Sequence, residues 1–215
     1  MEEKKLVFKK KMETWATKHY KRYYWRENRT DYTVFISEIF LQRTSVRQVS
    51  KIFEDFIQKV PNFQSLNFQN DTYIENLIKP LGLVNRRLKV LNKASEIIIT
   101  NFNGNLPQSY DSLIKIYGIG RYIANAILSF LFLKDTPIVD TNIIRIFQRY
   151  FDLKSSKKYV ENDENFWSLA EDLIPQKNPD IFNYGLIDFA HEICISKKPK
   201  CNICPVNKKC SYYKK

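Results

Sequence analysis

Glycine is scarce in this sequence, with only 5 glycines among 215 residues. Because glycine adopts left-handed backbone without steric cost and lets another chain approach closely, each of the five is expected to meet a local geometric demand. Histidine is rarer still, with 2 residues. Neither His19 nor His191 has the spacing of a metal-ligand pair, so histidines are not expected to build a zinc site.

Long apolar runs are also missing. No segment approaches the roughly 18 consecutive apolar residues that a membrane span requires, and the charged N-terminus MEEKKLVFKKK has no secretory apolar core behind it. We therefore expect a cytoplasmic protein without a membrane partner, in a reducing compartment where structural disulfides are rare.

Acidic residues are in deficit. The 35 Lys and Arg residues face 23 Asp and Glu, which gives a net charge of +12. This charge favours a polyanionic partner, either nucleic acid or an anionic membrane surface. A merely soluble basic protein is the alternative, so charge alone does not decide the function.

Strand-like alternation is weak everywhere, whereas apolar residues recur at helical spacing along the chain. An apolar content of 44% is ordinary for a folded protein and argues against general disorder. The sequence therefore predicts an all-α protein with short connections. An opening helix with an apolar face from Leu6 to Tyr20 and a run from Val46 to Val60, stopped by Pro61, are expected. The other expected helices are Thr33–Leu41, Asp71–Ile78, Asn85–Phe102, Ser109–Ile116, Tyr122–Leu133, Asn142–Tyr150, Glu164–Ile174 and Ile181–Ile195.

Three polar stretches divide this pattern. The stretch Tyr24–Thr30 separates the first helix from the second, and Lys134–Pro137 interrupts the chain after Leu133. A further polar stretch, Lys154–Asn162, is expected to be a surface loop or linker.

All four cysteines lie within the last 22 residues, in the pattern C-x6-C-x2-C-x5-C formed by Cys194, Cys201, Cys204 and Cys210. Such concentration in an intracellular protein predicts a metal or cluster site. Structural zinc usually takes two close ligand pairs, and only one C-x2-C is present here. Four thiolates in one compact loop suit a [4Fe–4S] cluster, with zinc as the alternative. Neighbouring lysines, including Lys200, give this loop a positive charge suited to phosphates, although a solvated basic tail has the same composition.

Two of the five glycines, Gly118 and Gly120, stand two residues apart between two helical segments. A G-x-G turn lets the backbone approach another chain, and the N–H groups of the helix that begins near Arg121 point outward. Together they could bind a phosphate without reading bases, whereas a tight interhelical turn is the plain alternative.

Asp140 follows two β-branched residues and opens a helix, so the simplest interpretation is that it is the N-cap of that helix. A carboxylate at a helix N-terminus is also a suitable partner for a positive charge that develops on a sugar.

The hairpin L-x-x-x-x-G-I-G, the following V-D-x-N and the C-x6-C-x2-C-x5-C pattern together resemble the helix–hairpin–helix DNA glycosylases of the endonuclease III type. The resemblance extends from Tyr24-Trp25-Arg26 to Cys210. It implies two helical domains with a DNA cleft between them: residues 27–135, a six-helix domain with the hairpin, and residues 1–26 with 136–215, which carry the cluster. It also implies that the [4Fe–4S] cluster is structural and positions DNA. The enzyme is then expected to be nucleoid-associated and to act as a monomer on double-stranded DNA with a mismatched or damaged base.

The residue after the hairpin divides this family. Bifunctional members have a lysine there, which forms a Schiff base with the sugar and leads to strand cleavage. This chain has Tyr122, and a phenol cannot form a Schiff base. The resemblance therefore implies a monofunctional enzyme in which water adds to the sugar, Asp140 stabilises the sugar cation and Tyr122 walls the base pocket.

The segment Ser37–Thr44 is similar to S/T-E-x-x-L-x-x-T of the mismatch-specific glycosylases, in whose adenine members the glutamate protonates the leaving base. Glu38 stands among apolar residues, so we expect it to be partly buried with a raised pKa, although a surface glutamate is the alternative. The resemblance implies that Gln42 and Arg43 enter the duplex and fill the place of the flipped base.

The substrate base is the open question. Adenine enzymes carry a tyrosine pair where this chain has Leu83 and Val84, and the sequence stops five residues after Cys210, where those enzymes continue into a further domain. The chain is more similar to the archaeal-type thymine mismatch glycosylases, although Gln42 departs from the arginine expected there. The expected substrate is thymine or uracil opposite guanine, and adenine opposite guanine or 8-oxoguanine is the alternative. A non-enzymatic DNA-damage-binding protein and a zinc-dependent transcription factor are the rivals from other classes.

Overall fold

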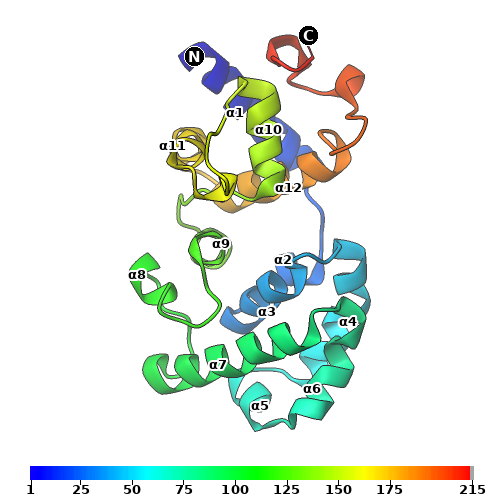
Figure 1. Ribbon diagram of the computed structural model, residues 1–215, viewed down its shortest axis with the longest axis vertical. Coiled ribbons are helices and arrows are strands. Elements are labelled where there is room, and N and C mark those ends of the chain that lie inside the picture. Colours follow the sequence, from blue (N-terminus) through cyan, green and yellow to red (C-terminus); the bar gives the residue numbers. More distant parts are fainter. Residues whose placement is uncertain (214–215) are drawn as a thin grey trace. The chain divides into compact units, whose positions relative to one another are not determined.

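The computed structural model describes residues 1–213, and every regular element in that range is a helix. The all-α prediction is therefore confirmed. The chain divides into two compact units (Figure 1). One unit joins Met1–Lys21 to the chain from Leu133 onward, and the other is Arg22–Phe132. No helix within residues 1–213 is both long enough and apolar enough to cross a membrane.

The first unit contains both ends of the described chain, coloured blue and red in Figure 1. Its helices are α1 (Glu2–His19), α10 (Thr141–Phe151), α11 (Glu164–Leu173) and α12 (Pro179–Glu192), with short 3-10 turns η2 (Val160–Asn162), η3 (Cys201–Ile203) and η4 (Asn207–Lys209).

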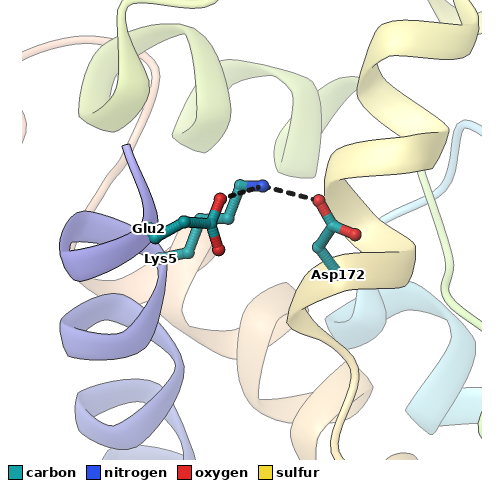
Figure 2. Close-up of polar contacts among 3 residues, drawn as sticks. All are labelled: Glu2, Lys5 and Asp172. Carbon is teal, nitrogen blue, oxygen red and sulfur yellow. Dashed lines mark hydrogen bonds and ion pairs between the residues drawn. The ribbon is translucent and has the colours of Figure 1, made fainter.

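Helix α1 is held against its neighbours by both apolar and polar contacts. The centroids of the Phe8 ring and the Tyr150 ring of α10 are 4.8 Å apart, and the Trp15 ring packs edge to face against Phe189 of α12. A methyl group on Gly185 would stand only 2.2 Å from the Ala16 side chain, so glycine is required where α12 crosses α1. Lys5 bonds Glu2 at 2.9 Å and Asp172 of α11 at 2.7 Å (Figure 2).

The second unit is built around a buried helix, α3 (Asp31–Leu41), in which every residue from Tyr32 to Phe40 is buried. Around it and beside one another lie α2 (Tyr24–Glu27), α4 (Val46–Lys59), α5 (Phe63–Phe68), α6 (Asp71–Ile78), η1 (Lys79–Leu81), α7 (Val84–Phe102), α8 (Tyr110–Leu113) and α9 (Arg121–Phe130).

Several elements of this unit differ from the sequence prediction, including α9, which ends at Phe130 rather than at Leu133. The supposedly polar stretch from Tyr24 contains helix α2, whose Trp25 and Arg26 are buried. Helix α5 was not predicted, because six residues are too short to show a helical period. Helix α8 ends at Leu113, and turns rather than α-helix follow as far as Gly118. In contrast, α6 has the bounds that its apolar spacing predicted.

Candidate active site and DNA-contact elements

Asp140 is the N-cap of α10 and lies half-buried in the first unit. Its Oδ1 accepts hydrogen bonds from the backbone N–H groups of Asn142 at 2.9 Å and Ile143 at 2.8 Å. Its Oδ2 accepts one from the side-chain amide of Asn142 at 2.7 Å. Because a carboxylate oxygen can accept two bonds, Oδ2 retains acceptor capacity for a water molecule or a sugar. The predicted N-cap role of Asp140 is confirmed.

A polar chain leads from Asp140 to the cysteine segment, which we define as Cys194–Cys210. The Asn142 Oδ1 accepts from Arg145 Nη1 at 3.1 Å. The same guanidinium donates from Nε to the Cys194 carbonyl at 2.9 Å and from Nη2 to the Ala190 carbonyl at 3.0 Å. Burial lowers the pKa of Arg145, so its charge is partly removed from water. Arg145 therefore connects the cysteine segment to the Asn142 side chain through hydrogen bonds to both.

Arg149 holds the same segment one turn farther along α10. Its guanidinium donates to the carbonyls of Ile195 and Ser196, each at 2.7 Å, and Nη1 lies 3.6 Å from the Cys194 sulfur. The backbone N–H of Tyr212 in turn donates to the Arg149 carbonyl at 2.9 Å. Helix α10 therefore carries Asp140 at its N-terminus and binds the cysteine segment along its C-terminal half.

The four cysteines line one pocket, together with apolar side chains such as Ile146 and Phe189. None of the four forms a disulfide. Burial raises the pKa of the Cys204 thiol to about 11 and also raises that of Cys201. Among the described residues, no His, Cys, Asp and Glu side chains form a group of three that could hold a metal ion. A [4Fe–4S] cluster places each thiolate on its own iron atom, so its ligands need not converge on one point.

Lys200 lies at the surface beside the cysteine segment's 3-10 turn η3, and Lys197, Lys198 and Lys208 are exposed as well. Lys209, in contrast, is engaged in an ion pair with Glu3 of α1. The exposed lysines give this side of the first unit a positive surface, as the sequence predicted.

The glycine hairpin lies in the second unit between α8 and α9. Gly118 has a φ of +83°, and a Cβ on it would lie 2.6 Å from Val90 Cγ1, so both backbone and packing require glycine. Gly120 faces open space and caps α9 without any side-chain cap, which leaves the first N–H groups of α9 free of a capping side chain. Arg121 and Tyr122 follow at the start of α9 and are half-buried. The geometry suits a phosphate at the N-terminus of α9.

Glu38 lies in the middle of α3 and is only 6% exposed, more deeply buried than the sequence predicted. The α3 helix then ends, and Gln42 is half-buried while Arg43 is exposed. Arg43 has a φ of +54°, a left-handed conformation that is uncommon for a residue other than glycine. The turn that we predicted to contact DNA is therefore sharp and presents Arg43 to solvent.

The sequence analysis gave no DNA-contact role to two residues near this turn. Leu83, the N-cap of α7, is 46% exposed with a φ of +51°, directly after the left-handed Gly82. Arg87 is 3% exposed, and its guanidinium donates hydrogen bonds to the carbonyls of Gly82 and Gln42. Three of its four acceptors lie 43 to 47 residues away in the chain, so the role of Arg87 leaves no local sequence signal. The glycine before Leu83 was a signal, since few other glycines exist in the chain.

Comparison with known proteins adds an independent result. A model of the HhH-GPD superfamily of base excision DNA repair proteins matches residues 36–172. The chain belongs to this superfamily. It is 34% identical over 195 residues to a thymine/uracil-DNA glycosylase of Pyrobaculum aerophilum, covering 89% of this chain and 84% of that protein. It is 39% identical over 186 residues to an adenine DNA glycosylase of Buchnera aphidicola, of which it spans 53%.

A solved structure of a thermostable thymine-DNA glycosylase superposes on this superfamily member with a TM-score of 0.93 at 33% identity, covering 99% of this chain and 98% of that one. The predicted resemblance to helix–hairpin–helix glycosylases, with thymine mismatch and adenine enzymes as relatives, is thus confirmed. The fold class is confirmed by the same match.

Proposed function

We propose that this superfamily member is a monofunctional DNA glycosylase that hydrolyses the N-glycosidic bond of thymine or uracil mispaired with guanine, acting as a monomer on double-stranded DNA. The similarity to thymine and thymine/uracil glycosylases over nearly the whole of both chains carries the substrate class. A G·T or G·U pair is also easier to open than a matched pair, which favours its capture by an enzyme that extrudes bases. Adenine is the second candidate, favoured by the identity to the Buchnera enzyme and opposed by Leu83 and Val84.

Asp140 is the residue that we assign to the sugar. As the glycosidic bond breaks, positive charge develops on the deoxyribose, and a fixed carboxylate stabilises that charge without having to reorganise. The three hydrogen bonds that Asp140 accepts fix its orientation, and the remaining capacity of Oδ2 can orient a water molecule or take its proton. Asp140 therefore combines charge stabilisation with activation of the attacking water.

Glu38 and Tyr122 are assigned to the base. A buried carboxyl group such as that of Glu38 can hydrogen-bond the departing pyrimidine, and its burial strengthens the interaction. Tyr122 stands at the position where a lyase would carry an amine, and its phenol walls the pocket without forming an imine.

DNA contacts are assigned to the second unit's hairpin and turn and to the basic surface of the first unit. The Gly118–Gly120 hairpin and Arg121 bind phosphate through backbone N–H groups and charge. Gln42 and Arg43 enter the duplex where the base has left, and Lys200 adds a phosphate contact.

A [4Fe–4S] cluster bound by Cys194, Cys201, Cys204 and Cys210 completes the proposal. The donor set fits: four free thiols line one apolar pocket, and the Arg149 guanidinium adjoins the Cys194 sulfur. When bound, the cluster supplies structural cross-linking of a segment that has little apolar core of its own. Absorbance near ~400 nm and iron by elemental analysis would identify it, whereas zinc thiolates are colourless.

The experiment that tests the substrate uses the full chain in single-turnover excision on duplexes that carry G·T, G·U, A·G, A·8-oxoguanine or an oxidised pyrimidine. We expect excision of thymine and uracil opposite guanine and a rate at least about 100-fold lower on both adenine pairs. Faster excision of adenine would establish the second candidate. Tight binding to every duplex without excision from any would make the protein a damage-binding module and refute the proposal.

The same reactions test the monofunctional assignment. Tyr122 offers no amine, so the DNA strand should stay intact until alkali is added, and borohydride should trap no covalent adduct. Tyr122→Lys places an amine at the lyase position and should yield both nicking and an adduct. Efficient trapping by the wild-type protein would contradict the assignment and indicate that another lysine is the nucleophile.

A further inference from the structure

Arg87 of α7 is a buried cation that joins two exposed turns of the second unit. Its Nη2 donates to the carbonyls of Phe40 at 3.3 Å and Gln42 at 2.7 Å, and to Thr44 Oγ1 at 2.5 Å. Its Nη1 donates to the carbonyl of Gly82 at 3.4 Å. One guanidinium therefore holds the turn after α3, Gln42–Thr44, and the turn before α7, Gly82–Leu83.

The two turns are linked a second time through Thr44. Its hydroxyl accepts from Arg87 and lies 3.2 Å from the carbonyl of Leu81. Phe40 and Gln42 belong to the end of α3, where backbone carbonyls lack helical partners and where a positive charge is favourable. Arg87 thus satisfies the end of one helix while it fixes the start of another.

Both turns keep unusual backbone conformations while they present side chains to solvent. Arg43 has a φ of +54° and Leu83 a φ of +51°, and both side chains are exposed. A left-handed residue other than glycine carries strain and persists only where its surroundings hold it. Leu83 is an exposed apolar side chain of the kind that can enter between stacked bases. We call the four hydrogen bonds that Arg87 donates to the two turns the clamp. The clamp therefore holds both turns in conformations that they would not adopt alone.

The burial of Arg87 is not explained by a gain in folding stability. Its pKa is lowered by burial first and by Arg86 second, which reflects the cost of removing the charge from water. Within residues 1–213 its hydrogen-bond acceptors are three carbonyls and one hydroxyl with no carboxylate, and its Nε has no partner. A well-packed apolar residue is often as stabilising as a buried charge. The geometry of the fork, which reaches two separate turns, is what arginine supplies here.

We propose that Arg87 is a positioning residue for base extrusion: it fastens the Gln42–Thr44 turn to the Gly82–Leu83 turn, so that Arg43 and Leu83 meet the duplex as one preformed unit. The proposal rests on the glycosylase function proposed above. Preformed side chains lose less conformational freedom when they replace an extruded base, so the clamp lowers the barrier to extrusion.

The first test compares Arg87→Met with the matched control Arg86→Met, which removes the same charge from an exposed position of the same helix. With enzyme saturating over a G·U duplex, Arg87→Met should lower the single-turnover excision rate by about 10- to 100-fold. Arg86→Met should stay within about twofold of wild type. The fluorescence of a 2-aminopurine placed beside the target base should rise more slowly with Arg87→Met, because the target base leaves the stack more slowly.

The second test separates positioning from general loss of structure. A double-mutant cycle combines Arg87→Met with Leu83→Ala and Arg43→Ala. If Arg87 acts through those side chains, its penalty should shrink to less than about threefold once they are gone. An equal penalty in both backgrounds would overturn the proposal, as would a wild-type rate and fluorescence trace for Arg87→Met.

Two further variants keep the proposal testable if Arg87→Met does not fold. Thr44→Val retains the arginine but removes one link, and should lower the rate by about 3- to 10-fold. Arg87→Lys keeps the charge without the fork, and should fall between Arg87→Met and wild type. Wild-type rates for both variants would overturn the clamp. Absence of excision by wild-type protein on every duplex would instead refute the glycosylase function on which the clamp rests.

Discussion

Helix α10 and the pair of turns at Gln42–Thr44 and Gly82–Leu83 hold functional side chains in opposite ways. Asp140 caps a regular helix, has an ordinary φ of −119° and has hydrogen bonds to both carboxylate oxygens. Arg43 and Leu83 lie in left-handed conformations, and the arginine that fixes their turns has an unpaired buried Nε. The residue assigned to chemistry is held without strain, whereas residues assigned to DNA entry are held with strain.

Both regions nevertheless use the same device. Arg145 and Arg149 donate to carbonyls of the cysteine segment, and Arg87 donates to carbonyls of the two turns. In each case planar guanidinium groups on a helix hold backbone carbonyls of a neighbouring segment in place. The two regions differ in one respect: the cysteine segment also carries the four thiols of the proposed cluster, whereas the two turns contain no cysteine.

Removal of the proposed cluster should have the largest effect on the protein. Cys204→Ala deletes one proposed ligand from a segment with little apolar core, so we expect colourless, poorly soluble protein without iron. Absorbance near ~400 nm, iron content and thermal unfolding measure the effect. Ile203→Ala, at a neighbouring position that is 68% exposed, is the matched control and should resemble wild type. Stable, active Cys204→Ala protein without iron would show that the cysteines do not hold a structural cluster.

A smaller effect is expected when the hydrogen-bonded connection between the cysteine segment and Asp140 is broken at Arg145. Arg145→Met removes the bonds to Asn142, Cys194 and Ala190, and should lower the excision rate about 10-fold while the cluster absorbance persists. Because the glycine hairpin and the Gln42–Arg43 turn are in the other unit, most of the assigned DNA contacts are kept, so the Kd for duplex DNA should rise less than the excision rate falls. The exposed Gln148→Met on the same helix is the control. An unchanged rate would mean that Asp140 is oriented by its cap bonds alone.

A third, weaker effect concerns the ion pairs of Lys5, a residue to which no role in excision is assigned. Lys5→Met breaks the bonds to Asp172 and Glu2 (Figure 2), and should lower the Tm by about 1–3 °C without altering excision. Hydrogen bonds to Asp172 first and Glu2 second raise the pKa of Lys5, so this stabilisation is present at neutral pH and is lost as the pH rises through the raised pKa. Lys10→Met, at an exposed position of α1, is the control. Thermal melts at neutral and alkaline pH would show a constant difference if the account of Lys5 were wrong.

The features that the sequence predicted are ones that a clear local pattern defines; short helices and contacts between distant segments were missed. The cap at Asp140, the hairpin at Gly118 and the bounds of α6 follow from a few adjacent residues. Helices α2 and α5 were missed because four or six residues show no period. Arg87 was missed because its acceptor Phe40 lies 47 residues away in the chain. Its strong hydrogen bonds arise only once two turns have come together, which no short pattern records.

Asp140 is assigned a chemical role in addition to its role as a helix cap. Asp163 offers a matched control, since it is the N-cap of α11 in the same unit. The decisive measurement is the single-turnover rate and the duplex Kd of Asp140→Asn beside Asp163→Asn. Asn still caps a helix, so both variants should fold and bind DNA. We predict that the rate falls at least about 1000-fold for Asp140→Asn and stays within about twofold of wild type for Asp163→Asn. A near wild-type rate for Asp140→Asn would contradict the account.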